Sequence, residues 1–325
     1  FTEFGRLDVL SDGRAVTVAA SWTASSVVVV ISKDGKTEIL NNQKPSILDT
    51  GNISKPKPIS FSSGSNLEAH AFYFEPKNQR FQSLNELPPL IVLSHGGPTS
   101  SARSSFDPAV QFWTNRGFAV VDVNYGGSTG FGTEYRNRLN GNWGITDTQD
   151  CVEAAKHLAK NGFADRDRLI IKGGSAGGYT TLCALTWHNI FAAGISRYGV
   201  ADLETLARDT HKFESKYLDS LIGPWPEKSD IYIERSPIHH THLLSTPMII
   251  LQGSEDAVVP PAQAESLVSS LASANIPHSY LLFEGEGHGF RQAENIAKAL
   301  ESELSFLGQI LGFEPAGSIT QVEIK

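Results

Sequence analysis

This sequence has no long apolar run, no excess of positive charge and only two cysteines, and each of these features excludes a class of protein. No apolar stretch approaches the roughly 20 residues that a helix needs to cross a bilayer. The first residues, Phe1-Thr2-Glu3, show neither the basic region nor the apolar core of a signal peptide. A formal net charge of −8 argues against a nucleic-acid partner. We therefore expect neither nucleic acid nor membrane as a partner, with a cytoplasmic location as the default.

Only two cysteines, Cys151 and Cys183, are present among the 325 residues, and both fall in predicted helices. We expect them to be buried and reduced rather than joined in a disulfide. The hydrophobic content of 40% and the charged content of 19% are ordinary for a globular protein. The length suits one α/β domain of about 250 residues with an appendage.

The first 57 residues are predicted to be β-structure. Residues 15–20 and 26–31 are rich in β-branched side chains, and residues 37–40 can pair back after a turn. Two or three strands are too few to close a core, so this segment resembles part of something larger. Residues 41–58 contain three prolines and are predicted to be a linker.

Strands and helices alternate after this segment, which predicts a mostly parallel sheet covered on both faces, an α/β fold. The predicted strands lie at 70–74, 90–93, 118–123, 169–171, 192–196, 248–251 and 280–283. The predicted helices lie at 107–116, 146–160 and 179–187, and a last helix places Ile296, Leu300, Leu304, Leu307 and Leu311 on one stripe. Ligands bind such sheets at the carboxyl ends of the strands. The chemistry-bearing loops, at 95–98, 125–130, 173–178, 253–260 and 284–290, all follow predicted strands.

The sequence Gly173-Gly174-Ser175-Ala176-Gly177 lies between an apolar strand and a helix. This G-x-S-x-G pattern, in that context, is typical of a nucleophile elbow, in which a strained serine needs small neighbours. We predict that Ser175 is a nucleophile. The alternative is a glycine-rich turn with an incidental serine.

A serine hydroxyl needs a base to take its proton, and histidine is the usual one. Of ten histidines, His288 alone lies in a glycine-rich loop, residues 285–290, after the last predicted strand. The acid that orients it should fall between serine and histidine in the chain. Asp256, in a loop after a buried strand, is our choice, and the adjacent Glu255 is the alternative.

A developing oxyanion needs preorganised N–H donors. One should be the backbone N–H of Ala176, which follows the nucleophile. The other should come from the loop His95-Gly96-Gly97-Pro98, with Gly97 as the expected donor. The alternative for this loop is an ordinary glycine turn.

With these motifs together, the chain resembles the catalytic domain of the prolyl oligopeptidase family of serine peptidases. Within that family it is most similar to the acylaminoacyl-peptidase and dipeptidyl-aminopeptidase subgroup. The matching stretches are 95–98, 124–132, 173–178, 208–217, 236–240, 253–260 and 285–290. The resemblance implies an α/β-hydrolase domain capped by a β-propeller that admits only short peptides. It also implies cleavage near the substrate N-terminus without a metal or cofactor.

Two positions depart from the family pattern. Gly126 stands where the family often has an arginine, so a substrate contact from that arginine is absent. His95 stands where some branches have a tyrosine whose hydroxyl completes the oxyanion hole. This second departure favours a main-chain donor.

Candidate substrate contacts are Tyr125, Phe213, Glu214 and Tyr217; for the last three the alternative is a helix packed on the domain surface. The run at 239–242 holds three histidines without a cysteine or carboxylate at ligand spacing. We expect those histidines to be structural, and no metal site.

Three functions stay open. A serine peptidase acting on short peptides near their N-terminus is favoured, and a carboxylesterase with the same machinery is the alternative. A non-catalytic binding or scaffold protein is the third, against which the intact serine, histidine and aspartate argue. The preferred side chain before the scissile bond cannot be read from the sequence.

We divide the chain into a β-rich segment at 1–57, a catalytic domain at 58–314 and a tail at 315–325. A propeller blade needs about 40–45 residues and a propeller needs several blades. The first segment is therefore predicted to be part of one blade, and the chain a C-terminal piece of a longer protein. Its partners would be a short peptide substrate and either a second copy or the remaining blades.

Overall fold

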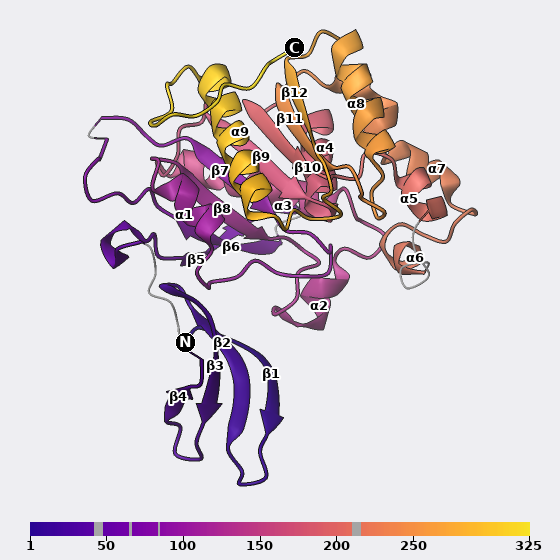
Figure 1. Ribbon diagram of the computed structural model, residues 1–325. Coiled ribbons are helices and arrows are strands. Elements are labelled where there is room, and N and C mark those ends of the chain that lie inside the picture. The colour runs from indigo at the N-terminus through magenta and orange to yellow at the C-terminus, as the bar shows by residue number, and fades with distance from the viewer. Residues whose placement is uncertain (42–47, 65–66, 84, 210–215) are drawn as a thin grey trace.

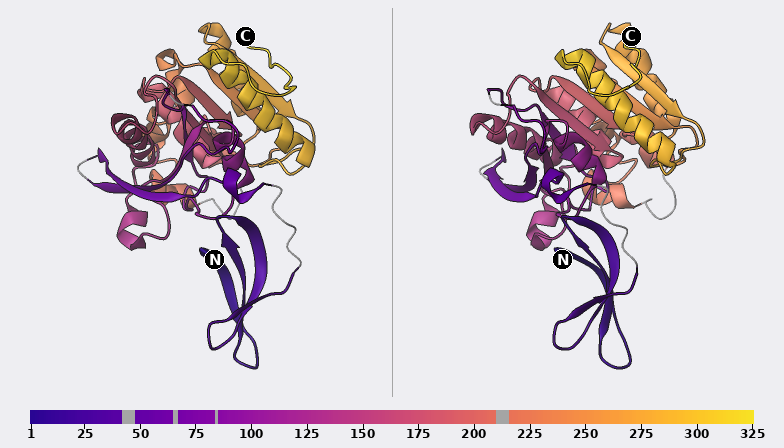
Figure 2. Two further views of the ribbon diagram at one scale, coloured as in Figure 1. Left: turned by 90° about the vertical axis from the view of Figure 1, so that its left-hand side faces the viewer. Right: turned by 60° about the vertical axis from the view of Figure 1, so that its left-hand side comes forward.

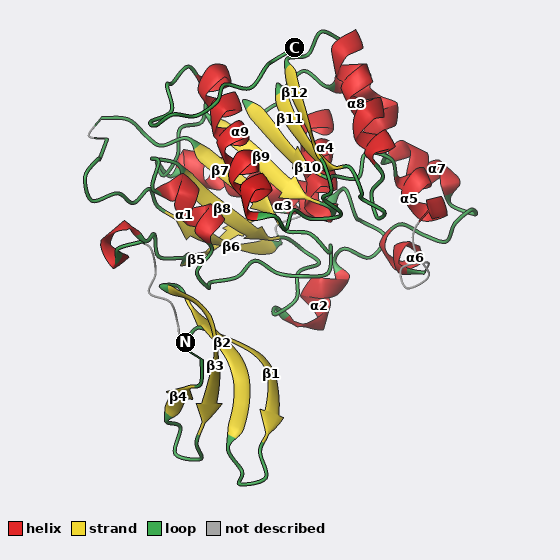
Figure 3. Ribbon diagram, viewed as in Figure 1, coloured by secondary structure: helices red, strands yellow, loops and turns green. Residues whose placement is uncertain are grey.

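A computed structural model describes residues 1–41, 48–64, 67–83, 85–209 and 216–325. They form two sheets, one of four strands and one of eight. The small sheet projects from one side of the larger body in all the views (Figures 1 and 2). The helices gather around the large sheet (Figure 3).

The small sheet is an antiparallel meander in the order β1-β2-β3-β4. Its strands are β1 (Glu3–Val9), β2 (Ala15–Ser21), β3 (Ala24–Ile31) and β4 (Thr37–Ile39). The predicted strands at 15–20 and 26–31 are confirmed. Strand β1 was not among the named strands, although Arg6 to Val9 alternate between polar and apolar side chains, and its residues are almost all exposed.

This small sheet encloses little core. Its buried cluster consists of Ala19, Val27 and Val29. Several large apolar side chains stay exposed on it: Phe4, Leu7, Val9, Val18, Val28 and Ile39. Among the described residues, neither outer strand pairs with a further strand. Contact with the body includes two hydrogen bonds, from Phe106 N to Ser21 O (2.8 Å) and from Ser104 N to Glu3 Oε1 (2.9 Å).

The large sheet has the order β12-β11-β10-β9-β7-β8-β6-β5. Strands β12 to β8 in that order are parallel, while β6 and β5 are antiparallel to their neighbours. The strands are β5 (Lys57–Ser62), β6 (Glu68–Phe74), β7 (Leu90–Ser94), β8 (Ala119–Asn124), β9 (Leu169–Gly174), β10 (Ala193–Arg197), β11 (Met248–Gly253) and β12 (His278–Phe283). The mostly parallel sheet is confirmed, but β5 begins inside the stretch predicted as a linker.

Helices cover both faces of this sheet (Figure 3). They are α1 (Pro108–Thr114), α2 (Gly132–Asn137), α3 (Thr146–Lys160), α4 (Ala176–Trp187), α5 (Leu203–Asp209), α6 (Tyr217–Leu221), α7 (Ser229–Glu234), α8 (Pro261–Ser273) and α9 (Ala293–Leu311), with 3₁₀ turns η1 (Thr50–Asn52) and η3 (Pro237–Leu243). None of these described helices combines the length and apolar content needed to cross a bilayer.

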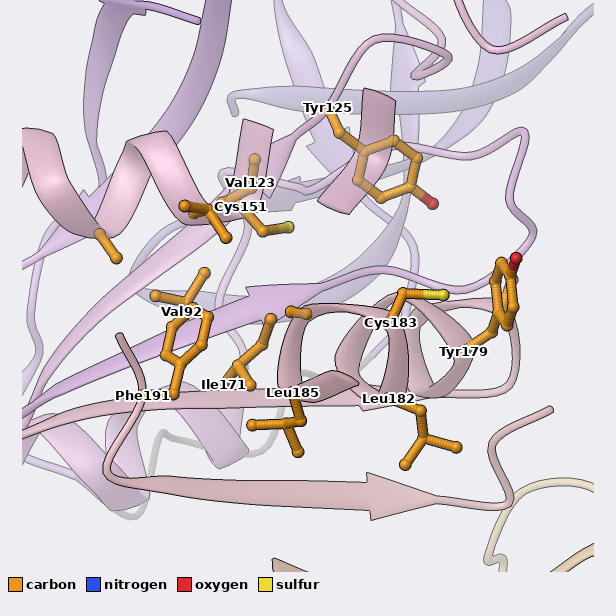
Figure 4. Close-up of a cluster of buried hydrophobic side chains, with 14 of the residues drawn as sticks. Val92, Val123, Tyr125, Cys151, Ile171, Tyr179, Leu182, Cys183, Leu185 and Phe191 are labelled. Atoms are coloured by element: carbon orange, nitrogen blue, oxygen red, sulfur yellow. The ribbon is translucent and has the colours of Figure 1, made fainter. Parts of the chain in front are cut away.

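The core forms two layers, because side chains of a strand alternate between its faces. Val92 and Ile171 pack on one face against α3 and against α4, which contributes Cys183 (Figure 4). Ile91 and Ile170 pack against α1 and α9 on the other. Cys151 and Cys183 are buried free thiols, as predicted.

The last helix, α9, buries Leu304 and Leu307, while Leu300 and Leu311 pack at the edge of the same cluster. Ile296 is 39% exposed, so the predicted stripe is wrong at its first position. The tail after α9 folds back onto this face through Ile319, Val322 and Ile324. Lys325 and His278 exchange two backbone hydrogen bonds, of 2.9 and 3.1 Å, so the chain end lies beside β12.

Candidate active site

The loops predicted to carry the chemistry lie at the carboxyl ends of β7, β8, β9, β11 and β12. Parallel strands bring these ends to one edge of the sheet. The elbow at that edge joins β9 to α4 through Ser175, whose backbone angles are φ 56° and ψ −123°. A positive φ is strained for a residue with a side chain, and such strain is typical of functional positions. The N–H of Ser175 donates to the carbonyl of Arg197 at 3.0 Å, which ties the elbow to β10.

The elbow depends on close backbone contacts that only glycine allows. A Cβ on Gly177 would lie 2.0 Å from the carbonyl oxygen of Ser94. A Cβ on Gly173 would lie 2.1 Å from the carbonyl oxygen of Gly177. The Ser94 hydroxyl donates to that same carbonyl at 2.8 Å. Strand β7 therefore lies directly against the turn that presents Ser175.

Gly177→Ala is expected to destabilise the protein by about 3 kcal/mol or more, because the added methyl group meets backbone that cannot move aside cheaply. Thermal unfolding and the rate of serine labelling by a fluorophosphonate would measure the loss. Gly5→Ala is the matched control, since its methyl group would meet only Val18, at 3.4 Å or more. An unchanged melting temperature and labelling rate for Gly177→Ala would contradict this account of the elbow.

His288 lies between the other two candidate catalytic residues. Its Nε2 is 2.7 Å from the Ser175 hydroxyl, and its Nδ1 is 2.9 Å from Oδ2 of Asp256. Asp256 is buried, and its other oxygen accepts from the N–H groups of Val258 and Val259, each at 2.9 Å. These donors hold the carboxylate in place and compensate its burial.

Glu255, the alternative acid, is exposed on the same loop. Its backbone N–H donates to the carbonyl of Glu286 at 2.9 Å. Of the two neighbouring carboxylates, Asp256 is the one within hydrogen-bond distance of His288.

The loop that presents His288 is held by a residue that sequence reasoning missed, Glu286. Its buried carboxylate accepts from the N–H groups of Arg291 and Gln292, at 2.9 and 3.0 Å, and from Asn295 Nδ2 at 2.9 Å. A carboxylate a few residues before a helix is the available sequence pattern, because helix N-termini favour negative charge. Glu286 thereby joins the loop to the start of α9.

The predicted oxyanion loop lies against the elbow. A Cβ on Gly96 would be 3.3 Å from the Gly174 carbonyl, and Gly97 has a φ of 126°, which favours glycine. On the elbow side, Ala176 begins α4, and first-turn N–H groups have no acceptor within their own helix. The two predicted donors thus belong to segments that touch, and their role stays a prediction.

His95 is already engaged on both ring nitrogens. Nδ1 is 2.9 Å from the Gly96 carbonyl, and Nε2 is 2.7 Å from the Ser128 hydroxyl. Burial lowers the pKa of His95 to about 4, so the ring is neutral at neutral pH. A neutral, occupied imidazole is consistent with main-chain donors rather than this side chain at the oxyanion.

Tyr125 requires a correction as a candidate substrate contact. Its side chain is fully buried and stacks on His95, with ring centroids 4.1 Å apart. Its hydroxyl donates to the carbonyls of His95 (2.9 Å) and Pro98 (3.2 Å). Tyr125 therefore packs against the predicted oxyanion loop, at His95 and Pro98, instead of facing a substrate.

Tyr217 lies on the outer side of the same loop. Its hydroxyl donates to Thr99 Oγ1 at 2.7 Å and accepts from Thr99 N at 3.0 Å. It is half-buried, at the start of α6. Phe213 and Glu214 lie outside the described residues, so their predicted contacts stay predictions.

The histidine run has no carboxylate at ligand spacing in the sequence, but carboxylates from an earlier segment lie close to it in space. Folding brings His239 together with Asp202 and Glu204, with one ligand atom of each within 4.8 Å of the others. Both carboxylates are engaged inside the protein, since Asp202 accepts from the first N–H groups of α5 and Glu204 pairs with Arg208. We assign no metal role to this cluster.

An eight-stranded, mostly parallel sheet with a serine elbow after β9, an acid after β11 and a histidine after β12 defines an α/β-hydrolase fold with a candidate serine-hydrolase site. The chain belongs to the prolyl oligopeptidase family of serine peptidases, whose sequence model matches residues 104–314.

Curated relatives share this part of the chain. Dipeptidyl aminopeptidase BIII of Pseudoxanthomonas mexicana is 35% identical over 70% of this chain and 34% of its own length. The acylamino-acid-releasing enzyme of Homo sapiens is 30% identical over 69% of this chain and 31% of its own length. The chain therefore spans only about a third of the length of these relatives.

Solved structures match almost the whole chain. A crystal structure of puromycin hydrolase superposes with a TM-score of 0.96 at 41% identity, covering 99% of this chain and 49% of that one. A mutant of puromycin hydrolase complexed with PGG superposes equally well, at 40% identity. Because the match extends to residues 1–57, the small sheet also has a counterpart in these structures.

Proposed function

We propose that this chain is the catalytic part of a serine peptidase that hydrolyses short peptides near their N-terminus, with Ser175, His288 and Asp256 as its triad. The observation that supports it most is His288, whose two nitrogens lie 2.7 Å from Ser175 Oγ and 2.9 Å from Asp256 Oδ2. Family membership and relatives named as aminopeptidase and acylamino-acid-releasing enzyme support the reaction class.

The reaction begins when the Ser175 oxygen attacks the carbonyl carbon of the scissile amide and its proton passes to His288 Nε2. The carbonyl electron pair moves onto oxygen, where the N–H groups of Gly97 and Ala176 stabilise the charge. The C–N bond then breaks as His288 returns the proton to the leaving amine. This leaves an ester between Ser175 and the acyl part of the substrate.

Water completes the cycle by the same steps. His288 takes a proton from water while the water oxygen attacks the ester carbonyl. His288 then gives that proton to Ser175 as the ester bond breaks. Asp256 stays ionised throughout, holds the imidazole in the required tautomer and stabilises its cation.

A carboxylesterase is the second candidate, because the same triad cleaves esters. Amide cleavage additionally requires protonation of a poor leaving group, which His288 Nε2 is positioned to supply. This geometry serves both reactions, so the peptidase is favoured by membership of a serine-peptidase family and by relatives named as aminopeptidase and acylamino-acid-releasing enzyme.

The substrate class is tested by comparing an aminoacyl anilide, puromycin and a short acyl ester. We expect all three to be hydrolysed, with kcat/KM for the anilide within about 10-fold of that for the ester, since an enzyme selected for amides retains ester cleavage. An acylated anilide should then separate free from blocked N-termini. Ester cleavage with no measurable anilide or puromycin hydrolysis would favour the carboxylesterase, and no labelling by a fluorophosphonate would contradict both.

We also propose the division into a β-segment at 1–57, a catalytic domain at 58–314 and a tail at 315–325. The pairing of β5 with β6 from Lys57 onward supports the first boundary. The tail is bound to the catalytic unit through Lys325 and His278, so we expect the two to unfold together. The cytoplasmic location stays a prediction, as does association of the small sheet with further β-structure.

A further inference from the structure

A buried carboxylate that the proposed mechanism does not use lies beneath the elbow. Glu303, on α9, has a fully buried side chain. One of its oxygens contacts Lys172 Nζ, and the other accepts from Arg197 Nε at 2.6 Å. The two cations are themselves mostly buried, with side chains 10% and 16% exposed. A group of two cations and one anion in the interior requires closely held geometry.

The two cations lie on the strands that carry the elbow. Lys172 is on β9, three residues before Ser175. Arg197 is on β10, and its carbonyl accepts the hydrogen bond from Ser175 N. Glu303 thus links the strand that leads into the nucleophile to the strand end that holds the nucleophile's own backbone.

Arg197 also reaches toward the histidine loop. Its guanidinium lies 6.0 Å from the ring centroid of Phe290, two residues after His288. Tyr198, the first residue after β10, contacts the rings of both His288 and Phe290, at centroid distances of 5.0 and 5.4 Å. The end of β10 therefore lies between the elbow and the histidine loop. Glu303, on α9, holds the side chain of Arg197 at this strand end.

We propose that Glu303 is a positioning residue for the active site, whose carboxylate binds Lys172 and Arg197 and so keeps Ser175 and His288 at reacting distance. The inference rests on the proposed function, because it assigns a role within that site. Small displacements suffice for a large effect, since a misplacement of about 1 Å in a catalytic group can cost about 100-fold in rate.

The protonation state of Lys172 should make kcat depend on pH. Burial, reinforced by the charge of Arg197 and opposed by Glu303 and Asp107, lowers the pKa of Lys172 to about 8. Above that pH the contact with Glu303 loses its charge, so kcat should decline. Stability moves the other way, because the unfolded chain holds this proton to higher pH and folding therefore becomes more favourable between about pH 8 and 10.4. Destabilisation by the titration of Lys172 itself therefore does not explain such an alkaline loss of activity.

The test compares Glu303→Gln and Lys172→Met with the wild-type protein, using kcat, KM and the fluorophosphonate labelling rate, each per folded molecule. Glu303→Gln is expected to lower kcat and labelling by about 10-fold or more with KM nearly unchanged. Lys172→Met leaves the charge-balanced pair of Glu303 and Arg197, so it should fold even if the first variant does not. It should lower kcat about 3-fold and remove the decline above pH 8.

Glu301→Gln is the matched control, since it makes the same chemical change at an exposed position of α9 and should leave all rates unchanged. Variants with wild-type rates per folded molecule, or a Lys172→Met protein that keeps the alkaline decline, would overturn the inference alone. An unreactive wild-type protein would overturn the proposed function, and this inference with it.

Discussion

Ser175→Ala is expected to reduce hydrolysis by about 10⁴-fold or more, and His288→Ala should cost about as much. The hydroxyl and the imidazole lie 2.7 Å apart and act as one unit, so removing either already removes the activated nucleophile. The double variant should therefore be little worse than either single one. Active-site labelling and kcat/KM on the anilide would measure all three.

The melting temperature provides the control for this comparison. Alanine retains the Cβ of Ser175 and loses only the hydroxyl, so the fold should be kept and no backbone strain is added. Losses that add up in the double variant would show that serine and histidine act independently, and the triad assignment would then be wrong.

Asp256→Asn should lower kcat by about 10⁴-fold while the protein stays folded. An amide at this position still fills the buried site, but it presents the wrong donor or acceptor to His288 Nδ1 and cannot stabilise the imidazolium. The Val258 and Val259 N–H groups can still be satisfied by the remaining amide oxygen. Steady-state kinetics and circular dichroism would measure the two effects.

Glu255→Gln is the matched control on the adjacent residue. Because Glu255 is exposed, this change should leave kcat within about 2-fold of the wild type. A large loss from Glu255→Gln together with an active Asp256→Asn would reverse our choice of acid.

The catalytic side of the fold could be predicted because its sequence patterns have local causes. The β9 strand begins with the apolar run Leu169-Ile170-Ile171, and the elbow needs glycine at 173 and 177 to avoid backbone contacts near 2 Å. Helix α3 has the predicted bounds, since its apolar face repeats at the helical period and glycine follows at 162. Asp256 and His288 were found by position after strands, which parallel topology brings together.

The sequence was least informative where contacts between residues distant in the chain determine a side chain's surroundings. Tyr125 lies in a glycine-rich loop at the carboxyl-end edge of the sheet, where substrate contacts are expected. Only the fold shows that its ring is buried against His95. Asp202 and Glu204 are 37 and 35 residues before His239 in the chain, so spacing could not bring them together. Glu303 likewise lies on a helix whose apolar stripe was predicted, yet its partners are on two strands far away in sequence.

Strand β1 shows the same limit in a different way. Its hydrogen bonds to β2 are regular over most of its length, with one irregularity between Phe4 and Leu7. Its side chains are nearly all exposed, so the polar and apolar alternation at residues 6–9 does not correspond to a buried face. Backbone pairing with β2 and the hydrogen bond from Ser104 N to Glu3 Oε1 place it, and neither contact is visible in the local sequence.

The small sheet has a practical consequence for work with this chain. Within the described part of the chain, it presents two open rows of amide and carbonyl groups next to exposed phenylalanine, leucine and valine side chains. Such surfaces promote edge-to-edge association between copies, and both the charged side chains on β1 and the net charge of −8 oppose it. We therefore expect self-association, which depends on protein concentration and ionic strength, to limit the usable concentration of this chain before the thermal stability of the catalytic body does.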